Sequence, residues 1–588
     1  MVRKLFQKLV DKRTRERNEL IDTFVNAECS ATGVLDKLFK LDLESNTVTS
    51  PDIYKDIEFW QTVFTKINSC ELKGGESYLR QLLSSVNCDI KELESRRDVV
   101  RQFEETFTDG AALTELKKNE QAVLSVFEDI DENLKDLFDM SYFKMFLTRK
   151  LNNSPGALTG YNIYRILVSP LVGILSPIVY FLVPYLVVIY KFKLNISFVQ
   201  YLRLTYDTLM NSDELFFGLG GSKKYKFASI ASYLFSLLFY FQGLFNSFEI
   251  SKSIYKISKH LSSKMNQVGE YLRTGCELVG KYYTDEMSKL FGSGLTLAEE
   301  LAYSKQLCNR KFSLFSNFGK HLYNYKNIQK QVIQSIMHKT YVLDCLASLV
   351  RFKSECGVGY TEFVQGGKPR LIVEGLRHVY IKDCVSNDLI LGGKQPNNAI
   401  ITGTNAGGKS VFIKSVLINY ILAQTCGLSC CDISVLTPMK YIKSQINMPD
   451  ATGYESLFEC EMHRCKANLD QLKEYQDCSL IVMDEIFSST NPIEAISGAY
   501  AVCKKMSGYE RNLLLFTTHF AYLTKLAKTG KFVNYKLETI VEGEDIHFTY
   551  KLVPGINKHY LALELLKKNG FDDDIIADAL EVKKKLVV

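Results

Sequence analysis

The stretch Ala399–Ser410, AIITGTNAGGKS, decides the fold of the C-terminal part of this chain. A short β-type run, Ala399–Thr402, leads into a glycine-rich loop, and the sequence VFIKSVLINYILAQ that follows is typical of a helix. The pattern G-x-x-x-x-G-K-[ST] between a strand and a helix predicts a phosphate-binding loop. Its glycines let backbone N–H groups curl around phosphate oxygens, and the positive end of the helix faces the same phosphates.

The residue types in this loop predict individual roles in binding ATP and Mg²⁺. We expect Lys409 to reach the β- and γ-phosphates and Ser410 to ligate the metal. A chance glycine-rich turn is the alternative, but it would not need a strand before it and a helix after it. The predicted nucleotide-binding residues of the loop are Gly403, Thr404, Asn405, Ala406, Gly407, Gly408, Lys409 and Ser410.

A second apolar run, Ser479–Met483, ends in two acidic residues, Asp484 and Glu485. In P-loop enzymes the carboxyl end of such a buried strand holds the metal. We therefore expect Asp484 to bind Mg²⁺ and Glu485 to polarise the attacking water. A pair of acidic residues on the surface would not need an apolar run before it.

A third run, Asn512–Thr517, is followed closely by His519. A histidine at the end of a neighbouring strand can contact a γ-phosphate or position the attacking water, although a lone histidine is more often structural. Because it follows the two preceding motifs in this order, we predict that Lys409, Glu485 and His519 are the catalytic residues.

Outward from these motifs, the composition changes along the chain. Its 588 residues suffice for about three to five domains. The predicted fold class is α plus α/β, in which a helical core and lever domain, interrupted by an apolar hairpin, precedes a P-loop NTPase domain with a mainly parallel sheet. The predicted parts are an N-terminal helical segment at 1–60, a helical core at 61–160, the apolar hairpin at 161–250, a helical lever at 251–354 and the ATPase domain at 355–588.

Two stretches without charged residues, 166–190 and 227–248, define the apolar hairpin. Each exceeds the roughly 18–20 apolar residues that cross a bilayer. Arg165 precedes the first stretch and Lys191 follows it, as expected at membrane interfaces. We predict a transmembrane hairpin, which would place both large zones in the same compartment.

A pair of buried helices in a large soluble domain is the alternative. Pro170, Pro177 and Pro184 favour the membrane interpretation, because soluble helices tolerate interior proline poorly. Gln242 and Asn246 make the second stretch the weaker span.

Composition limits the compartment and the partners. The net charge of +6 is compatible with nucleic acid or an anionic membrane surface and selects neither. The 15 cysteines lack metal-site spacing and indicate free thiols in a reducing compartment. Residues 1–20 are basic and lack the apolar run of a secretory signal. We expect an intracellular, membrane-associated protein with its ATPase domain in the cytoplasm.

Taken together, the C-terminal motifs resemble the ATPase domain of the MutS family. Upstream, residues 377–379 and 387–388 resemble the segment that lines the adenine site, and residues 75–83 and 93–100 resemble the start of the helical core. Residues 557–562 and the final helix are similar to the family's helical C-terminal end. Residues 403–410 are similar to the family loop G-P-N-M-G-G-K-S, and residues 456–462 are similar to the family segment S-T-F-M-x-E-M. Residues 484–492 are similar to the segment D-E-x-G-R-G-T-S-T, and residues 516–520 are similar to F-A-T-H-Y.

The resemblance implies an ABC-type, MutS-like ATPase that uses ATP and Mg²⁺ and pairs as a homodimer through its ATPase domains. It implies that Asn387 binds the nucleotide and that Ser456 approaches the γ-phosphate held by the partner subunit. DNA and a lipid bilayer both remain open as further partners.

Three departures limit what the resemblance implies. No N-terminal domain with a Phe-x-Glu mismatch wedge has room before the core, and the only similar residues, 103–105, fall within a predicted helix. The apolar zone occupies the place of the DNA clamp. The arginine that usually precedes the signature serine is absent, and Glu455 precedes Ser456 here.

Three functions fit this pattern. The first is a MutS-type ATPase that acts on DNA in mismatch repair or recombination, tethered to a membrane. The second is a membrane-anchored motor or sensor that lacks mismatch recognition. The third, a transporter ATPase, is disfavoured because no L-S-G-G-Q signature precedes Asp484 and two spans are few for a half-transporter.

Overall fold

The computed structural model describes most of the chain, in two compact units. Unit 1 comprises 1–34, 115–276 and 297–334, and unit 2 comprises 35–114, 277–296 and 335–588. The predicted helical core at 61–160 is therefore divided between the units. The described residues are 19–21, 31–41, 43, 45–49, 52–128, 139–210, 223–307, 313–315, 318–404, 407–446, 457–474, 477–542, 545–557 and 570–586.

Unit 1 is helical in its described residues. Its α9 begins after Ser154, whose side chain accepts a hydrogen bond from the Ala157 backbone N–H, and Pro155 occupies the first turn, where no N–H is needed. The elements are η1 (Arg149–Asn153), α9 (Pro155–Ile163), the π-helical turn η2 (Tyr164–Val168), α10 (Ser169–Tyr190), α11 (Phe198–Met210), α13 (Lys223–Tyr282), α15 (Leu297–Gln306) and α16 (Phe318–Lys326).

The core of unit 1 lies where α9, α16 and α13 meet. Leu158, Phe318 and Leu322 are fully buried there, and Ile257 and Leu261 of α13 pack against them. The burial of these apolar side chains holds the three helices together.

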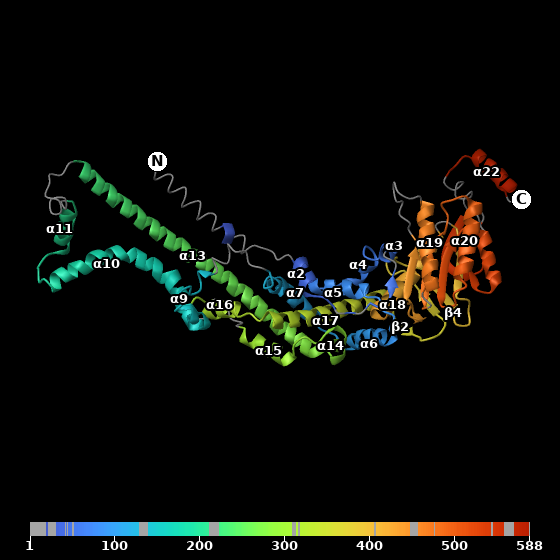
Figure 1. Cartoon of the computed structure of the whole chain (residues 1–588), viewed down its shortest axis with the longest axis horizontal. Helices are drawn as coiled ribbons and strands as arrows, with labels where there is room; N and C mark the ends of the chain where they lie inside the picture. Colours follow the sequence, from blue (N-terminus) through green and yellow to red (C-terminus); the bar gives the residue numbers. More distant parts are fainter. Residues whose placement is uncertain are drawn as a thin grey trace. The chain divides into compact units, whose positions relative to one another are not determined.

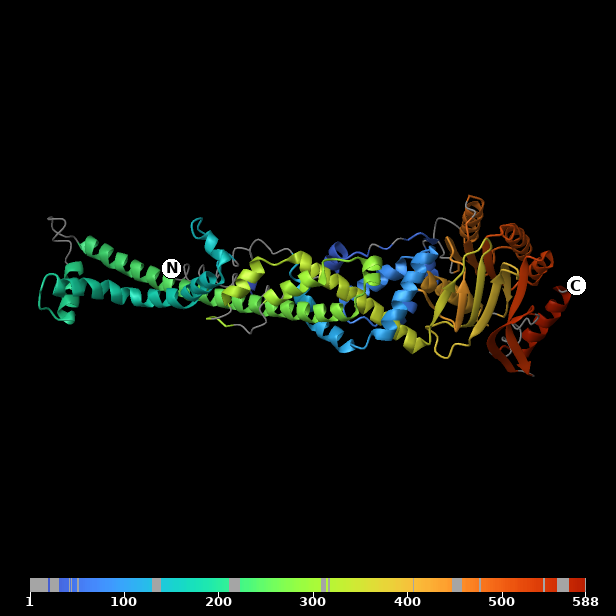
Figure 2. The ribbon, with the colours of Figure 1, turned by 90° about the horizontal axis from the view of Figure 1, so that it is seen from below.

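The helix α13 is continuous across the predicted boundary at 250/251, so one helix carries both the second apolar stretch and the start of the predicted lever. Residues 223–282 contain no proline that would end it. Figures 1 and 2 show α10 converging on α13 toward the Ser169 end of α10. By length and composition, the described helical stretch Pro155–Val179 could cross a membrane.

Unit 2 combines helices with two sheets. Residues of α7 (Gly110–Leu124), α17 (Lys330–Cys356), α2 and α13 are divided between the two units. Figure 1 shows α19 and α20 beside the sheet strands. The other helices are α2 (Ala31–Leu38), α3 (Ile53–Asp56), α4 (Val63–Ile67), α5 (Lys73–Ser84), α6 (Ile90–Thr106), α14 (Asp285–Phe291), α18 (Lys409–Cys426), α19 (Leu457–Glu474), α20 (Pro492–Met506), η3 (Ala521–Thr529) and α22 (Asp573–Leu586).

The larger sheet has seven strands in the order β1-β8-β9-β10-β5-β11-β12, and all its pairs are parallel except the antiparallel pair β11–β12. Its first strand, at 48–49, comes from the predicted N-terminal helical segment, so that segment is not wholly helical. The strands are β1 (Val48–Thr49), β8 (Tyr441–Gln445), β9 (Ser479–Met483), β10 (Asn512–Thr518), β5 (Asn398–Thr402), β11 (Phe532–Glu542) and β12 (Asp545–Pro554).

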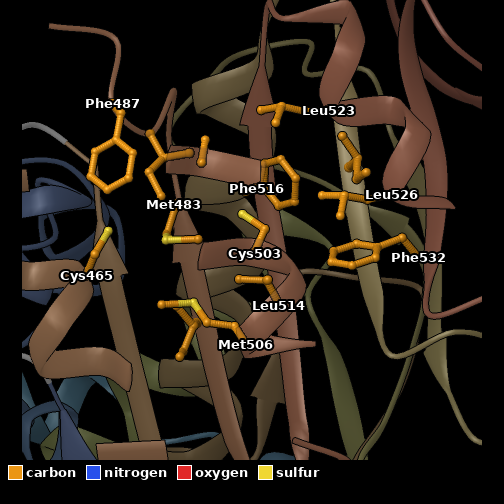
Figure 3. Close-up of a cluster of buried hydrophobic side chains, with 14 of the residues drawn as sticks. Cys465, Met483, Phe487, Cys503, Met506, Leu514, Phe516, Leu523, Leu526 and Phe532 are labelled. Carbon is orange, nitrogen blue, oxygen red and sulfur yellow. The ribbon is translucent and has the colours of Figure 1, made fainter. Parts of the chain in front are cut away.

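A continuous apolar core supports the central strands. Every residue of β5, β9 and β10 is buried, as expected for parallel strands covered on both faces. Figure 3 shows Met483, Leu514 and Phe516 of the sheet together with Cys503 and Met506 of α20. This core fixes where the strands end, and therefore where the polar residues after them lie.

The second sheet corrects the prediction of one mainly parallel sheet. Its order is β4-β3-β7-β2-β6, and only the pair β2–β7 is parallel. Buried and exposed residues alternate in part along β3 and β4, which suits antiparallel strands with one covered face. The strands are β2 (Gly359–Phe363), β3 (Arg370–Leu376), β4 (Asn387–Gly392), β6 (Leu428–Ser429) and β7 (Ile433–Leu436).

Candidate functional site

Three neighbouring parallel strands bring the predicted motifs to one edge of the larger sheet. β10 lies between β9 and β5, with Phe516 opposite Met483 and Thr518 opposite Thr402. The carboxyl ends of parallel strands meet at the same edge, which is where open α/β sheets bind ligands. The glycine-rich loop, the acidic pair and His519 therefore share one site.

The glycine-rich loop turns sharply into α18. Gly408 has φ +90°, a left-handed conformation that side chains other than glycine rarely adopt. The Gly407 N–H donates to the Thr404 carbonyl at 3.1 Å. The Lys409 ammonium donates to the carbonyls of Gly403 and Thr404, each at 3.2 Å. Lys409 is thus held back over its own loop.

The loop fits a phosphate group. Thr404 Oγ1 is buried and finds no hydrogen-bond partner among the described residues. A buried hydroxyl without a partner is costly, and a phosphate oxygen would relieve that cost. Lys409, buried and cationic, supplies the matching charge. The predicted loop residues Asn405 and Ala406 lie outside the described residues.

Asp484 lies against the first turn of α18. The Ser410 hydroxyl donates to Asp484 Oδ2 at 2.5 Å, and the Thr517 hydroxyl donates to Asp484 Oδ1. The Asp484 N–H donates to the Gln445 carbonyl at 2.8 Å. Hydroxyl and carboxylate oxygens are the ligands that Mg²⁺ prefers, so Ser410 and Asp484 are suited to hold that ion.

Glu485 connects the loop to His519. Its Oε1 lies 3.2 Å from the Lys409 ammonium, and its Oε2 lies 3.6 Å from His519 Nδ1. Contact with His519, assisted by Lys409 and opposed by burial, lowers the pKa of Glu485 to about 2. The carboxylate is therefore ionised at neutral pH, as a residue that polarises water must be.

The backbone at Glu485 is also unusual. Its φ is +45°, and Phe487 follows at +60°. Such conformations of non-glycine residues store strain and concentrate at functional sites. The Glu485 N–H donates to Thr517 Oγ1 at 3.1 Å, so the hydroxyl of Thr517 serves both acidic residues. The role of Thr517 could not be predicted from the sequence, because a threonine inside a strand has no distinctive pattern.

The segment 456–462, which was compared above with the family motif S-T-F-M-x-E-M, is only partly described. Ser456 lies outside the described residues, and α19 begins directly after it. The Ser489 hydroxyl donates to Glu461 Oε2 at 3.1 Å, and the rings of Phe458 and Phe487 meet edge to face at 5.6 Å. These contacts join α19 to the loop that carries the acidic pair.

Asn387 is placed differently from the phosphate-binding residues. Its amide donates to the Val385 and Tyr550 carbonyls, and its Oδ1 accepts from the Leu552 N–H at 2.6 Å. These bonds tie β4 to β12, so nucleotide binding by Asn387 stays a prediction. Tyr550 was not anticipated: a Cβ built on Gly408 would lie 3.1 Å from its ring, which is half exposed.

The segment at residues 52–58 forms a second, unpredicted set of polar contacts with elements of the site. Glu58 pairs with Lys414 of α18 at 2.9 Å. The buried Asp56 accepts from the Ser444 hydroxyl of β8 at 2.7 Å, and Asp52 pairs with Arg464 of α19 at 2.9 Å. Residues 52–58 therefore contact α18, β8 and α19.

Comparison with known proteins places the site in a family context. The family model described as MutS domain V matches residues 399–587. The chain is 28% identical over 250 residues to a DNA mismatch repair protein MutS of Pelotomaculum thermopropionicum, covering 41% of this chain and 28% of that protein. It is 28% identical over 329 residues to the DNA mismatch repair protein MSH3 of Saccharomyces cerevisiae, covering 53% and 30%.

A third relative extends the matched region. The DNA mismatch repair protein MSH6 of Saccharomyces cerevisiae is 26% identical over 372 residues, which cover 57% of this chain and 28% of that protein. In each of these three comparisons the chain spans less than a third of the relative's length. The similarity therefore concerns shared domains rather than whole proteins.

Proposed function

Because its C-terminal domain makes this chain a member of the MutS family, we propose that it binds and hydrolyses ATP with Mg²⁺ at the edge of the larger sheet. One observation carries the proposal: three adjacent parallel strands bring Asp484 into contact with Ser410 and Thr517, and Glu485 into contact with Lys409 and His519. We propose that the domain at 355–588 is a P-loop NTPase domain of the ABC type.

Each residue has a proposed task. The loop 403–410 cradles the phosphates, Lys409 stabilises their charge, and Ser410 and Asp484 would hold Mg²⁺. When bound, the ion neutralises charge that develops on the phosphate oxygens. Glu485, ionised beside Lys409 and His519, accepts a hydrogen bond from the attacking water and orients it, and His519 positions Glu485.

We further propose that two copies pair through their ATPase domains. Ser456 of one copy then approaches the γ-phosphate held by the other, so dimer assembly gates hydrolysis. We also propose that the chain consists of the five parts predicted from the sequence, from the segment at 1–60 to the ATPase domain at 355–588. DNA is the proposed partner in mismatch repair or recombination, since the relatives are named as DNA mismatch repair proteins.

A second candidate function is a membrane-anchored, MutS-like motor or sensor without mismatch recognition. The exposed apolar side chains of α10 favour it, because the charge-free hairpin stands where the family's DNA clamp would be expected. In both candidates we place the chain inside the cell and the ATPase domain in the cytoplasm.

Hydrolysis of ATP by the full chain in mild detergent tests the proposed site. Glu485→Gln should lower kcat by about 10²–10⁴-fold and leave ATP binding intact, because the amide keeps the shape but loses the charge that polarises water. Glu494→Gln, at an exposed position in the first turn of α20, is the matched control and should hydrolyse at the wild-type rate. Wild-type turnover by Glu485→Gln would remove the assignment.

Binding of duplex DNA at a series of salt concentrations separates the two candidates. A DNA-acting protein should lose affinity steeply as salt rises, because phosphate contacts release counterions. If duplex DNA does not bind even at low salt while hydrolysis is normal, the membrane-anchored candidate is favoured.

A further inference from the structure

Three prolines in α10 each leave one carbonyl group without its helical partner. Pro170, Pro177 and Pro184 have no N–H, so none of them can bond the carbonyl four residues earlier, at Ile166, Gly173 and Tyr180. The π-helical turn η2 lies directly before Pro170, and the Ser169 N–H bonds Tyr164 rather than filling the gap at Ile166. Each proline therefore creates a carbonyl that needs a donor from elsewhere.

Hydroxyl groups of α13 bond the first two of these carbonyls. The Ser251 hydroxyl donates to the Ile166 carbonyl at 2.5 Å, and the Tyr240 hydroxyl donates to the Gly173 carbonyl at 2.7 Å. Ser176 of α10 also donates to Gly173, at 2.9 Å. Two of the three proline gaps on α10 are thus matched by hydroxyls on its antiparallel neighbour.

Small residues let the two helices approach at the same place. A Cβ built on Gly173 would lie 2.8 Å from Leu244 Cδ2, closer than any side chain could tolerate without a shift. The hydroxyls of Ser169 and Ser247 lie 3.5 Å apart. Serine and glycine at such positions are typical of helix pairs in membranes, where close backbone approach replaces the hydrophobic driving force.

The outer surface of this pair is apolar over a wide arc. Leu171, Val172, Ile178 and Val179 are 55%, 53%, 58% and 54% exposed. At 100° per residue, these positions and their apolar neighbours cover well over half of the circumference of α10. A single helix of a protein partner would cover only a stripe of that surface.

Charged residues flank the apolar stretches of the two helices. On α13 the first charged residue after the apolar stretch is Glu249, and the bond between Ser251 and Ile166 brings the next one, Lys252, to the level of Arg165 at one end of the pair. At the other end of α10, Lys191 follows directly after the apolar stretch. An uncharged band with charged residues at its limits matches the hydrocarbon layer of a bilayer and its headgroups.

We propose that α10 and the first part of α13 form a hairpin inserted in a lipid bilayer, with its register set by α13 hydroxyls that bind the proline-freed carbonyls of α10. In water, solvent would satisfy these carbonyls and the hydroxyls would not be needed. In hydrocarbon no water is available, and a carbonyl without a donor is costly. This proposal goes beyond ATP hydrolysis and does not depend on it.

Alkaline carbonate extraction of membranes from cells that express the full chain tests the bilayer. The wild-type chain should stay in the membrane pellet, and Ile178→Lys/Val179→Lys should raise the extracted fraction roughly tenfold or more, because lysines at mid-helix oppose insertion. The control Ile575→Lys/Val582→Lys makes the same change at exposed positions of α22 and should stay in the pellet. Extraction of the wild-type chain overturns the proposal, since the apolar surface would then be covered by protein.

Cysteine cross-linking in membranes tests the register independently. Ser169→Cys/Ser247→Cys should form a disulfide on mild oxidation, identified by mass spectrometry of the linked peptides, whereas Ser176→Cys/Ser247→Cys should not. Tyr240→Phe/Ser176→Ala should lower the yield of the first cross-link several-fold, and adding Pro177→Ala should restore it by returning an N–H to the helix. Equal cross-linking by both cysteine pairs, or no effect of Tyr240→Phe/Ser176→Ala, would contradict the assigned register.

Discussion

The proposed nucleotide site and the α10–α13 hairpin differ from ordinary patterns of side-chain burial in opposite ways. At the nucleotide site a charged side chain, Lys409, is only 5% exposed and pairs with Glu485. In the hairpin, uncharged side chains such as Ile178 are more than half exposed. Buried charge and exposed apolar surface are the two observations that mark function, because each costs free energy in a soluble protein unless a ligand or another solvent offsets it.

The difference shows how each region is stabilised. Partners within the chain surround the charges of the nucleotide site, so the site is specified by its own contacts. In the hairpin, hydroxyls of α13 bond two of the carbonyls that prolines free in α10, and many apolar side chains of α10 are exposed. Substitutions at the proposed nucleotide site should therefore change ATP hydrolysis. Substitutions in the hairpin should change whether the chain stays in the membrane.

The largest effect is expected at the buried lysine. Lys409→Ala should lower ATP hydrolysis by about 10²-fold or more, because it removes a preorganised charge from the phosphates. Lys414→Ala, five residues later on α18, removes the partly exposed pair with Glu58 and should stay within about twofold of wild type. Steady-state phosphate release measures ATP hydrolysis by both variants. An equal loss of hydrolysis in the two would contradict the proposed role of Lys409.

A smaller effect separates the two halves of α13. Leu261 is 1% exposed in the core of unit 1, and Leu261→Ala should lower the free energy of unfolding by about 2–5 kcal/mol. Phe245 is 46% exposed on the same helix, and Phe245→Ala should change it by less than about 0.5 kcal/mol. Denaturant unfolding in detergent compares the two. A large loss from Phe245→Ala would show that this half is packed against protein.

The smallest expected effect is the acid dependence of Glu485. Its pKa is about 2 in the folded chain, below the ordinary 4.5, so ionised Glu485 stabilises the fold above pH 4.5. This contribution is lost as the pH falls from 4.5 toward 2. The difference in unfolding free energy between wild type and Glu485→Gln should shrink over this interval. A difference that stays constant with pH would show that His519 and Lys409 do not stabilise the carboxylate.

Some structural features could not be predicted because they depend on contacts distant in sequence. Strand β1 pairs with β8 across almost 400 residues of chain, and two residues are too few to show a strand pattern. The second sheet was missed because its short runs resemble those of the parallel sheet, and only pairing distinguishes them. The roles of Thr517 and Asn387 likewise follow from neighbours that no local pattern reveals.

By itself, the sequence determined the glycine-rich loop between a strand and a helix and the order of the motifs, because strand, loop and helix signals are local. It also determined the two charge-free stretches, since composition alone measures their length. Only the tertiary structure decided that Asp484, Glu485 and His519 share one edge with the loop, because strand order is set by pairing and not by chain order. The same holds for Tyr240 and Ser251, whose hydroxyls find the carbonyls of a helix far away in the sequence only when the two helices pack.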